Sequence, residues 1–231
     1  MASKAQCAFC FDVLVAHFED RSSLPLSSFE NSDSAAISEL TSSSSSSVSS
    51  VDTESFSKVT SANHKSHSSY PLFVTWNVVV RGQPRLRGCI GTFEPQPLER
   101  GLRTYARTAS RVRAFDDTRF NPILAKELPS LECGVSLLMD FEEASGPLDW
   151  EWGVHGIRIS FTVSGRRYSA TYLPDVPPEH FDSKEQTVES LVHKAGFSGA
   201  SWRTLSIKLV RYKGSKTSLS YAEYVAMKKR V

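Results

Sequence analysis

The sequence Leu-Arg-Gly-Cys-Ile-Gly at residues 86–91 predicts a strand that also carries a site. Side chains of a strand point alternately to its two faces, so Arg87, Cys89 and Gly91 should share one face. The opposite face takes the other residues of the segment, Leu86, Gly88 and Ile90. Glycines within a strand are typical of a bulge, or of a place where a ligand or another backbone approaches closely. The segment therefore predicts a guanidinium beside a thiol.

The residues around this segment predict a hairpin followed by a helix. Residues 72–80 are rich in β-branched and aromatic side chains and indicate the first strand. Gly82, Gln83 and Pro84 indicate the turn, and residues 86–93 the strand that pairs back. After Pro97, apolar residues recur at helical spacing, at Leu98, Leu102, Tyr105, Ala106 and Ala109. The opposite face of this helix carries four arginines, Arg100, Arg103, Arg107 and Arg111.

The rest of the chain alternates further hairpins with a few helices. We expect a short helical piece ending near Pro129, a helix over residues 187–195 that stops at Gly196, and a terminal helix over residues 220–228. Strands are expected over residues 131–139, 157–163, 167–172 and 205–212, the middle two joined by a turn at 164–166. Because no strand–helix–strand rhythm appears, the fold class should be α+β.

The N-terminal segment predicts an amphipathic helix that docks on a later part of the chain. Apolar residues form one stripe over residues 5–18: Cys7, Cys10, Phe11, Leu14, Val15 and Phe18. Cys7 and Cys10 form a C-x-x-C pair, but a zinc site needs two more ligands at matched spacing, so we expect no metal.

A serine-rich stretch separates this helix from the rest. Residues 21–69 show few aromatics and no periodicity, and residues 41–50 are nearly all serine. Such a segment buries too little apolar surface to offset its ordering entropy. We therefore expect three parts: an N-terminal helix at residues 3–20, a disordered insertion at 21–69 and a main body at 70–228. The insertion is interpreted as a flexible linker, although its serines offer sites for phosphorylation.

Composition excludes several classes of function. Lys and Arg total 27 against 25 Asp and Glu, a net charge of +2, so nothing steers the whole protein towards nucleic acid or an acidic membrane. No apolar run approaches the ~20 residues that cross a bilayer. The four cysteines come without a secretory leader, which favours reduced thiols. We expect a soluble protein of the cytoplasm or nucleus that binds neither membrane nor nucleic acid.

Eight motifs in this order resemble those of the AMMECR family, and the resemblance extends over nearly all of the chain outside the serine-rich stretch. They lie at residues 10–14, 70–76, 86–91, 117–120, 148–151, 153–157, 170–174 and 220–224. The resemblance implies an α+β domain of two subdomains, mainly an antiparallel sheet with flanking helices. It leaves both the reaction and any cofactor undefined.

The signature segment supplies most of the candidate site residues. Cys89 is a candidate nucleophile whose thiolate a neighbouring Arg87 would favour; the alternative is a small buried hydrophobic side chain. Arg87 is a candidate for holding a carboxylate or phosphate, together with backbone N–H groups at Gly88 and Gly91. The alternative for Arg87 is a plain surface cation. Arg119, in the matching motif at 117–120, is a further ligand-binding candidate.

His155 completes the set as a candidate acid or base, with a hydrogen-bonded structural histidine as the alternative. The four helix arginines are interpreted as a solvated face, because no recognised nucleic-acid module accompanies them. Two functions stay open. One is an enzyme or modifying factor that acts on a small anionic ligand at residues 86–91. The other is a non-catalytic protein-binding or scaffold module, in which the signature only shapes a groove.

Overall fold

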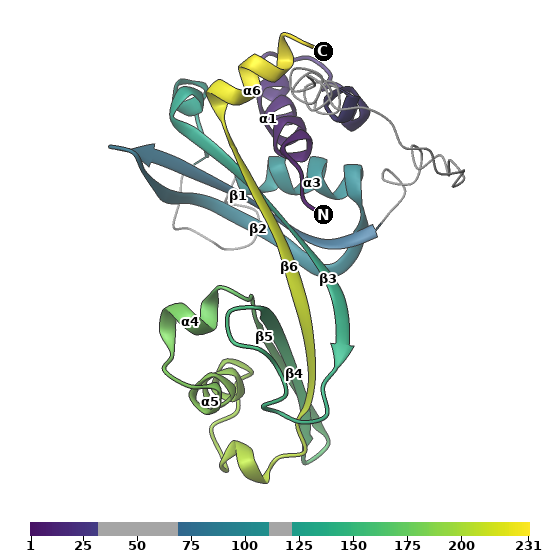
Figure 1. The fold of residues 1–231 in the computed structure, drawn as a ribbon, viewed down its shortest axis with the longest axis vertical. Coiled ribbons are helices and arrows are strands. Elements are labelled where there is room, and N and C mark those ends of the chain that lie inside the picture. The colour runs from purple at the N-terminus through teal and green to yellow at the C-terminus, as the bar shows by residue number, and fades with distance from the viewer. Residues whose placement is uncertain (32–68, 111–121) are drawn as a thin grey trace, which may run out of the picture. The chain divides into compact units, whose positions relative to one another are not determined.

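The structure is a computed structural model that describes residues 1–31, 69–110 and 122–231 (Figure 1). Its strands form a six-stranded sheet in the order β2-β1-β3-β6-β4-β5. The strands are β1 Ser69–Val80, β2 Gln83–Pro97, β3 Leu131–Glu143, β4 His155–Val163, β5 Arg166–Tyr172 and β6 Lys208–Ser220. The β1–β2, β1–β3, β4–β5 and β4–β6 pairs are antiparallel. The predicted α+β class is confirmed.

The chain divides into two compact units. The first takes residues 1–137 together with 216–231, and the second takes residues 138–215. The first unit contains α1 Lys4–Phe18, α3 Leu98–Ser110, a 3-10 helix Ala125–Ser130 and α6 Tyr221–Lys228. The second contains α4 Val176–His180, α5 Lys184–Lys194 and a 3-10 helix Trp202–Thr204. No helix in the described ranges is both long and apolar enough to span a bilayer.

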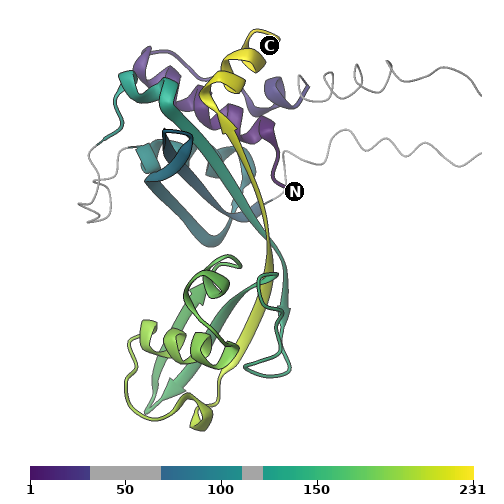
Figure 2. The same ribbon diagram turned by 60° about the vertical axis from the view of Figure 1, so that its left-hand side comes forward.

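The N-terminal helix α1 docks at the centre of the first unit, beside α3 and α6 (Figures 1 and 2). The Phe11 ring lies 5.0 Å from the Trp76 ring of β1, edge to face, and stacks on Tyr224 of α6 at 5.4 Å. Phe9 lies under the guanidinium of Arg103 from α3. The predicted docking is confirmed.

The expectation of an amphipathic α1 is wrong. Every residue from Ala5 to Ala16 is buried, including the polar Gln6 and Asp12, whereas Phe18 is only partly buried. The sheet, α3 and α6 leave α1 no solvent face over these residues, and the buried side chains of Leu26 and Phe29 add to this core. A stripe at helical spacing identifies one apolar face, but it cannot show that the opposite face is covered too.

Truncating the core residues of α1 should destabilise the protein strongly. Because Phe11 and Leu14 are almost fully buried, Phe11→Ala or Leu14→Ala is expected to cost about 2–5 kcal/mol in the free energy of unfolding. Urea denaturation of each variant measures this cost. Phe18→Ala, at the partly exposed end of the same helix, is the matched control and should cost clearly less. Parent-like unfolding of Phe11→Ala would contradict the observed packing.

The folded N-terminal part extends beyond the boundary expected at Asp20. Arg21 forms an ion pair with Asp12 of α1, and Leu26 and Phe29 are fully buried. The sequence did not predict this packing, because Leu26 and Phe29 are single apolar residues among many serines and other polar residues. Residues 21–31 therefore pack as part of the first unit. Of the rest of the expected insertion, residues 32–68 lie outside the described residues and Ser69 opens β1.

Both hairpin turns have two residues instead of the expected three: residues 81–82 in place of 82–84, and residues 164–165 in place of 164–166. In the first, Val80 pairs with Gln83, and the turn residues Arg81 and Gly82 have φ values of 53° and 76°. Positive φ at both turn positions is the geometry of a two-residue type I′ turn, which favours glycine at the second. Ser164 and Gly165 form the second turn in the same way, with φ values of 50° and 79°. Gln83 and Pro84 therefore belong to β2.

The last strand also differs from its prediction. β6 begins at Lys208 and continues to Ser220, whereas residues 205–212 were expected. Leu205 and Ile207 instead pack against the core of the second unit. Two of the core residues in β4 are Ile157 and Ile159, and α5 contributes Val188 and Leu191. Gly196, with φ +87°, follows α5 as predicted.

Candidate functional site

The signature segment lies on β2 and contains a bulge at Arg87. Cys89 pairs with Thr75 and Gly88 with Trp76, but the next pair joins Leu86 to Asn77. The register shift leaves Arg87 as the extra residue of β2. A bulge was one of the two features that the glycines predicted.

This bulge overturns the expected division of the segment into two faces. Thr75 and Asn77 lie two residues apart on β1 and so share a face of the sheet. Their partners Cys89 and Leu86 therefore lie on that same face, although strict alternation separates them. The prediction that placed Leu86 opposite Cys89 is wrong, because alternation holds only where no extra residue enters the strand.

The side chain of Arg87 is held by the carboxylate of Glu127. Its Nε donates to Oε1 of Glu127 at 2.8 Å, and a terminal nitrogen donates to Oε2 at 3.2 Å and to the Pro122 carbonyl at 3.2 Å. Only 14% of the Arg87 side chain is exposed. The hydrogen bonds from Arg87, together with one from the Leu124 amide, lower the pKa of Glu127 against the opposing effect of burial. Arg87 is thus not a plain surface cation, and this pair ties β2 to the segment before β3.

Cys89 is exposed, so the alternative of a buried hydrophobic cysteine is wrong. The hydroxyl of Thr75 donates a hydrogen bond to its sulfur at 3.1 Å. A donor to sulfur favours the thiolate over the thiol. Cys7, Cys10 and Cys133, by contrast, are buried.

The glycines of the segment are explained by close packing between strands. A Cβ atom on Gly91 would lie 2.2 Å from the Leu72 carbonyl oxygen and 2.5 Å from the Phe73 ring, so only glycine fits. Gly88 is buried opposite Trp76. The glycines also predicted a close approach by a ligand or another backbone. At Gly91 that approach is made by the backbone of β1.

The two remaining candidates lie elsewhere. His155 opens β4 in the second unit, and its Nδ1 accepts a hydrogen bond from the Glu151 amide at 2.9 Å. Its own amide donates to the Glu151 carbonyl at 3.0 Å, so these contacts close the turn before β4. Arg119 lies outside the described residues.

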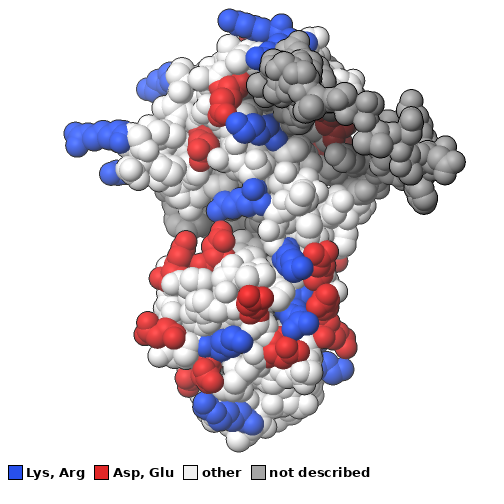
Figure 3. Space-filling view, in the orientation of Figure 1, with Lys and Arg blue, Asp and Glu red and all other residues white. Residues whose placement is uncertain are grey.

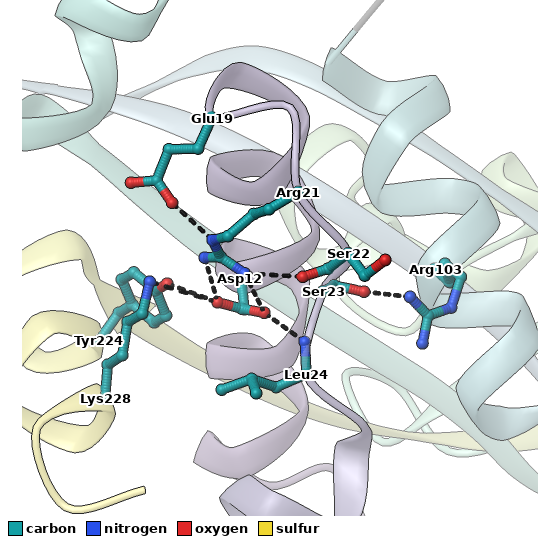
Figure 4. A network of polar contacts seen from close by, with 9 residues as sticks. All are labelled: Asp12, Glu19, Arg21, Ser22, Ser23, Leu24, Arg103, Tyr224 and Lys228. Atoms are coloured by element: carbon teal, nitrogen blue, oxygen red, sulfur yellow. Dashed lines mark hydrogen bonds and ion pairs between the residues drawn. The ribbon is translucent and has the colours of Figure 1, made fainter.

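Sequence reasoning missed a buried carboxylate, Asp12, at the centre of the first unit (Figure 4). Its two oxygens accept hydrogen bonds from Arg21 at 2.7 and 3.3 Å and from the Leu24 amide at 2.7 Å. Tyr224 of α6 donates a further one at 2.9 Å, and the Lys228 ammonium lies 3.6 Å away. The network joins α1, residues 21–24 and α6. An aspartate inside an apolar helical run was the available signal.

Four arginines in and just after α3 were expected to form a solvated face, but Arg103 makes contacts within the protein. It donates to Ser23 and to Glu99, the latter at 2.8 Å, and it covers the Phe9 ring. Arg107 is exposed and lines a hollow of about 340 Å³ with Arg103 and Arg21. Arg111 lies outside the described residues. Arg21 pairs with Asp12 and Arg103 pairs with Glu99, and these carboxylates reduce the positive charge of the hollow.

The three buried cysteines cluster where α1 meets β3. Burial raises the pKa of the Cys133 thiol, and hydrogen bonds with Cys10 and Cys7 raise it further. Cys7 also donates to the Thr217 carbonyl at 3.6 Å. In the part of the chain that the structure describes, no group of three His, Cys, Asp or Glu side chains is arranged to hold a metal ion.

Fold and signature together define an α+β protein of two units built on an antiparallel sheet, with a bulged signature strand at its edge. A family model described as AMMECR1 matches residues 8–217, so the chain belongs to the AMMECR1 family. An uncharacterized protein of Arabidopsis thaliana is 40% identical over 230 residues, which cover 97% of this chain and 88% of that protein.

Two further proteins are similar. An uncharacterized protein of Schizosaccharomyces pombe is 48% identical over 157 residues, which cover 68% of this chain and 79% of that protein. The crystal structure of an uncharacterized protein from Pyrococcus horikoshii matches with a TM-score of 0.53 and 26% identity. That match covers 71% of this chain and 81% of the other. The family predicted from the motifs is confirmed.

Proposed function

We propose that this protein is a modifying enzyme that acts on a small anionic ligand at residues 86–91, with Cys89 as its nucleophile. The observation that carries the proposal is the exposed Cys89 thiol, with the Thr75 hydroxyl donating to its sulfur at 3.1 Å. A nucleophilic cysteine must be reachable, and it acts as the thiolate.

The other candidates on β2 shape the surroundings of this thiol. Gly88 and the bulge at Arg87 shape the strand next to Cys89, and the Arg87–Glu127 pair holds the bulge in place. Because Glu127 offsets much of the charge of Arg87, the ligand's negative charge requires other donors as well. Backbone N–H groups near Gly88 and Gly91 and the side chain of Arg119 are the proposed ones. His155 belongs to the second unit, so its role as an acid or base stays a prediction and is not part of the reaction proposed at Cys89.

Alkylation of the native protein with iodoacetamide across a pH series tests the nucleophile. We expect Cys89 to react with a midpoint below about pH 8.5, the value of an unperturbed thiol. Thr75→Val should move this midpoint to higher pH because it removes the hydroxyl donor, while Thr75→Ser keeps the donor and should behave like the parent. The three other cysteines are buried, so peptide mapping assigns the reaction to Cys89. A Cys89 that stays unreactive until denaturation would refute the proposal.

A second candidate function, a protein-binding module, rests on a different observation. Val79, Val80 and Leu86, near the tip of the β1–β2 hairpin, are large apolar side chains with 37%, 39% and 48% exposure. Exposed apolar side chains that gather in one place are typical of interaction surfaces. An inert Cys89 would favour this function over the enzyme.

A further inference from the structure

The sheet of the second unit is polar around Ser160 on the side away from its core. Along β4, Ile157, Ile159 and Phe161 are buried in the core. Strand alternation therefore turns the residues between them, Arg158, Ser160 and Thr162, to the opposite face.

The neighbouring strands add two cations to this face. Ser160 pairs with Lys208 of β6, and Thr162 pairs with Arg167 of β5. Directly paired residues point to the same face of a sheet, so Lys208 and Arg167 flank the two hydroxyls. The signal was present in the sequence as alternation of Ser, Thr, Lys and Arg with apolar residues, but only strand pairing brings the three strands together.

A hollow of about 440 Å³ opens among these residues. It is lined by Ser160, Phe161, Thr162, Arg167, Ser206 and Lys208. Its volume falls in the range of small-molecule sites, about 300–1,000 Å³. The described lining contains two cations and three hydroxyl groups, and no carboxylate.

The two cations that line this hollow, Arg167 and Lys208, take no part in the ion pairs of the described structure. Elsewhere in the second unit, Arg211 pairs with Asp149 and Glu142, and Lys213 pairs with Asp140. In the described structure neither Arg167 nor Lys208 forms an ion pair or a side-chain hydrogen bond, and the same holds for Arg158. On the face of the molecule drawn in Figure 3, by contrast, Lys and Arg are interspersed with Asp and Glu.

We propose that this hollow binds the phosphate group of a small ligand. A phosphate carries a charge of about −1.5 to −2 and three acceptor oxygens. Arg167 and Lys208 supply matching charge, and Ser160, Thr162 and Ser206 supply hydroxyl donors. A carboxylate, with one charge and two oxygens, would leave part of this set unused. The site lies in the second unit and does not depend on the function proposed for Cys89.

Isothermal titration of the full chain with inorganic phosphate, at constant ionic strength, tests the proposal. We expect saturable binding that Arg167→Gln and Lys208→Gln each weaken at least tenfold. Arg166→Gln is the matched control, since it removes the same charge from the adjacent residue, whose guanidinium lies over the Tyr168 ring instead. Amide shifts in an NMR titration should centre on residues 158–169 and 206–210. Circular dichroism confirms that each variant is folded.

Two further arms identify the source of the phosphate. Once inorganic phosphate is shown to saturate the site, glycerol phosphate that binds at least as well supports a soluble phosphomonoester. Phosphatidic acid vesicles that bind where glycerol phosphate does not support a lipid headgroup. The proposal is overturned if phosphate binding does not saturate, or if Arg166→Gln weakens it as much as Arg167→Gln. Tighter binding of a single-stranded oligonucleotide, lost in the same two variants, would reassign the face to nucleic acid.

Discussion

Replacing Asp12 by alanine should lower the free energy of unfolding by about 3–5 kcal/mol, the cost of breaking a buried ion pair from one side. Asp12 is fully buried, and its removal takes one acceptor from the Arg21 guanidinium and leaves the Leu24 amide and the Tyr224 hydroxyl without this acceptor. Chemical denaturation measures the loss. Glu19→Gln is the matched control, because Glu19 also pairs with Arg21 but its side chain is 53% exposed. Exposed pairs contribute about 0–1 kcal/mol, so a similar loss in both variants would contradict the central role of Asp12.

The Asp12 prediction has a defined pH dependence. Burial acts to raise the pKa of Asp12, but hydrogen bonds from Arg21, Leu24 and Tyr224 outweigh it, so the pKa lies below its ordinary value. A carboxyl group with a lowered pKa in the folded state stabilises the fold above its unfolded pKa of about 3.9, and this stability is lost as the pH falls through the folded pKa. The difference in stability between the parent and Asp12→Asn should therefore be constant near pH 7 and shrink below about pH 4.

Replacing Gly91 by alanine is the second change with a large expected effect, about 3 kcal/mol or more, at the upper end of over-packing. The new Cβ would lie 2.2 Å from a backbone oxygen, that of Leu72, which cannot move without separating β1 from β2. Urea denaturation measures the loss. Gly146→Ala is the control, because a Cβ at Gly146 meets nothing within 4 Å and should change stability by less than about 0.5 kcal/mol.

This variant also separates a packing role from a ligand role. If Gly91 were present only to let a ligand approach, Gly91→Ala would unfold like the parent and lose only the ligand. Parent-like stability of Gly91→Ala would therefore contradict the packing explanation and favour a ligand at this position. The structure supports packing, because the Phe73 ring that lies against Gly91 also packs on Phe93 at 5.1 Å, edge to face.

Much of the candidate site could be named from the sequence, but its geometry could not. The segment at residues 86–91 showed that Arg87, Cys89 and the glycines belong together. It could not show that the Arg87 guanidinium would form an ion pair with Glu127, 40 residues later in the chain. It also could not show that Thr75 would donate to Cys89, since that contact depends on the register of β1 against β2.

The sequence by itself determined the family, the α+β class and the approximate extent of most helices and strands. These features rest on local patterns, namely apolar spacing, turn residues and ordered motifs, which each segment carries wherever it packs. Only the tertiary structure decided the bulge at Arg87, the complete burial of α1, the anchoring of residues 21–31 and the pairing that creates the polar face around Ser160. Each of these depends on a partner distant in the chain, and local spacing carries no information about such a partner.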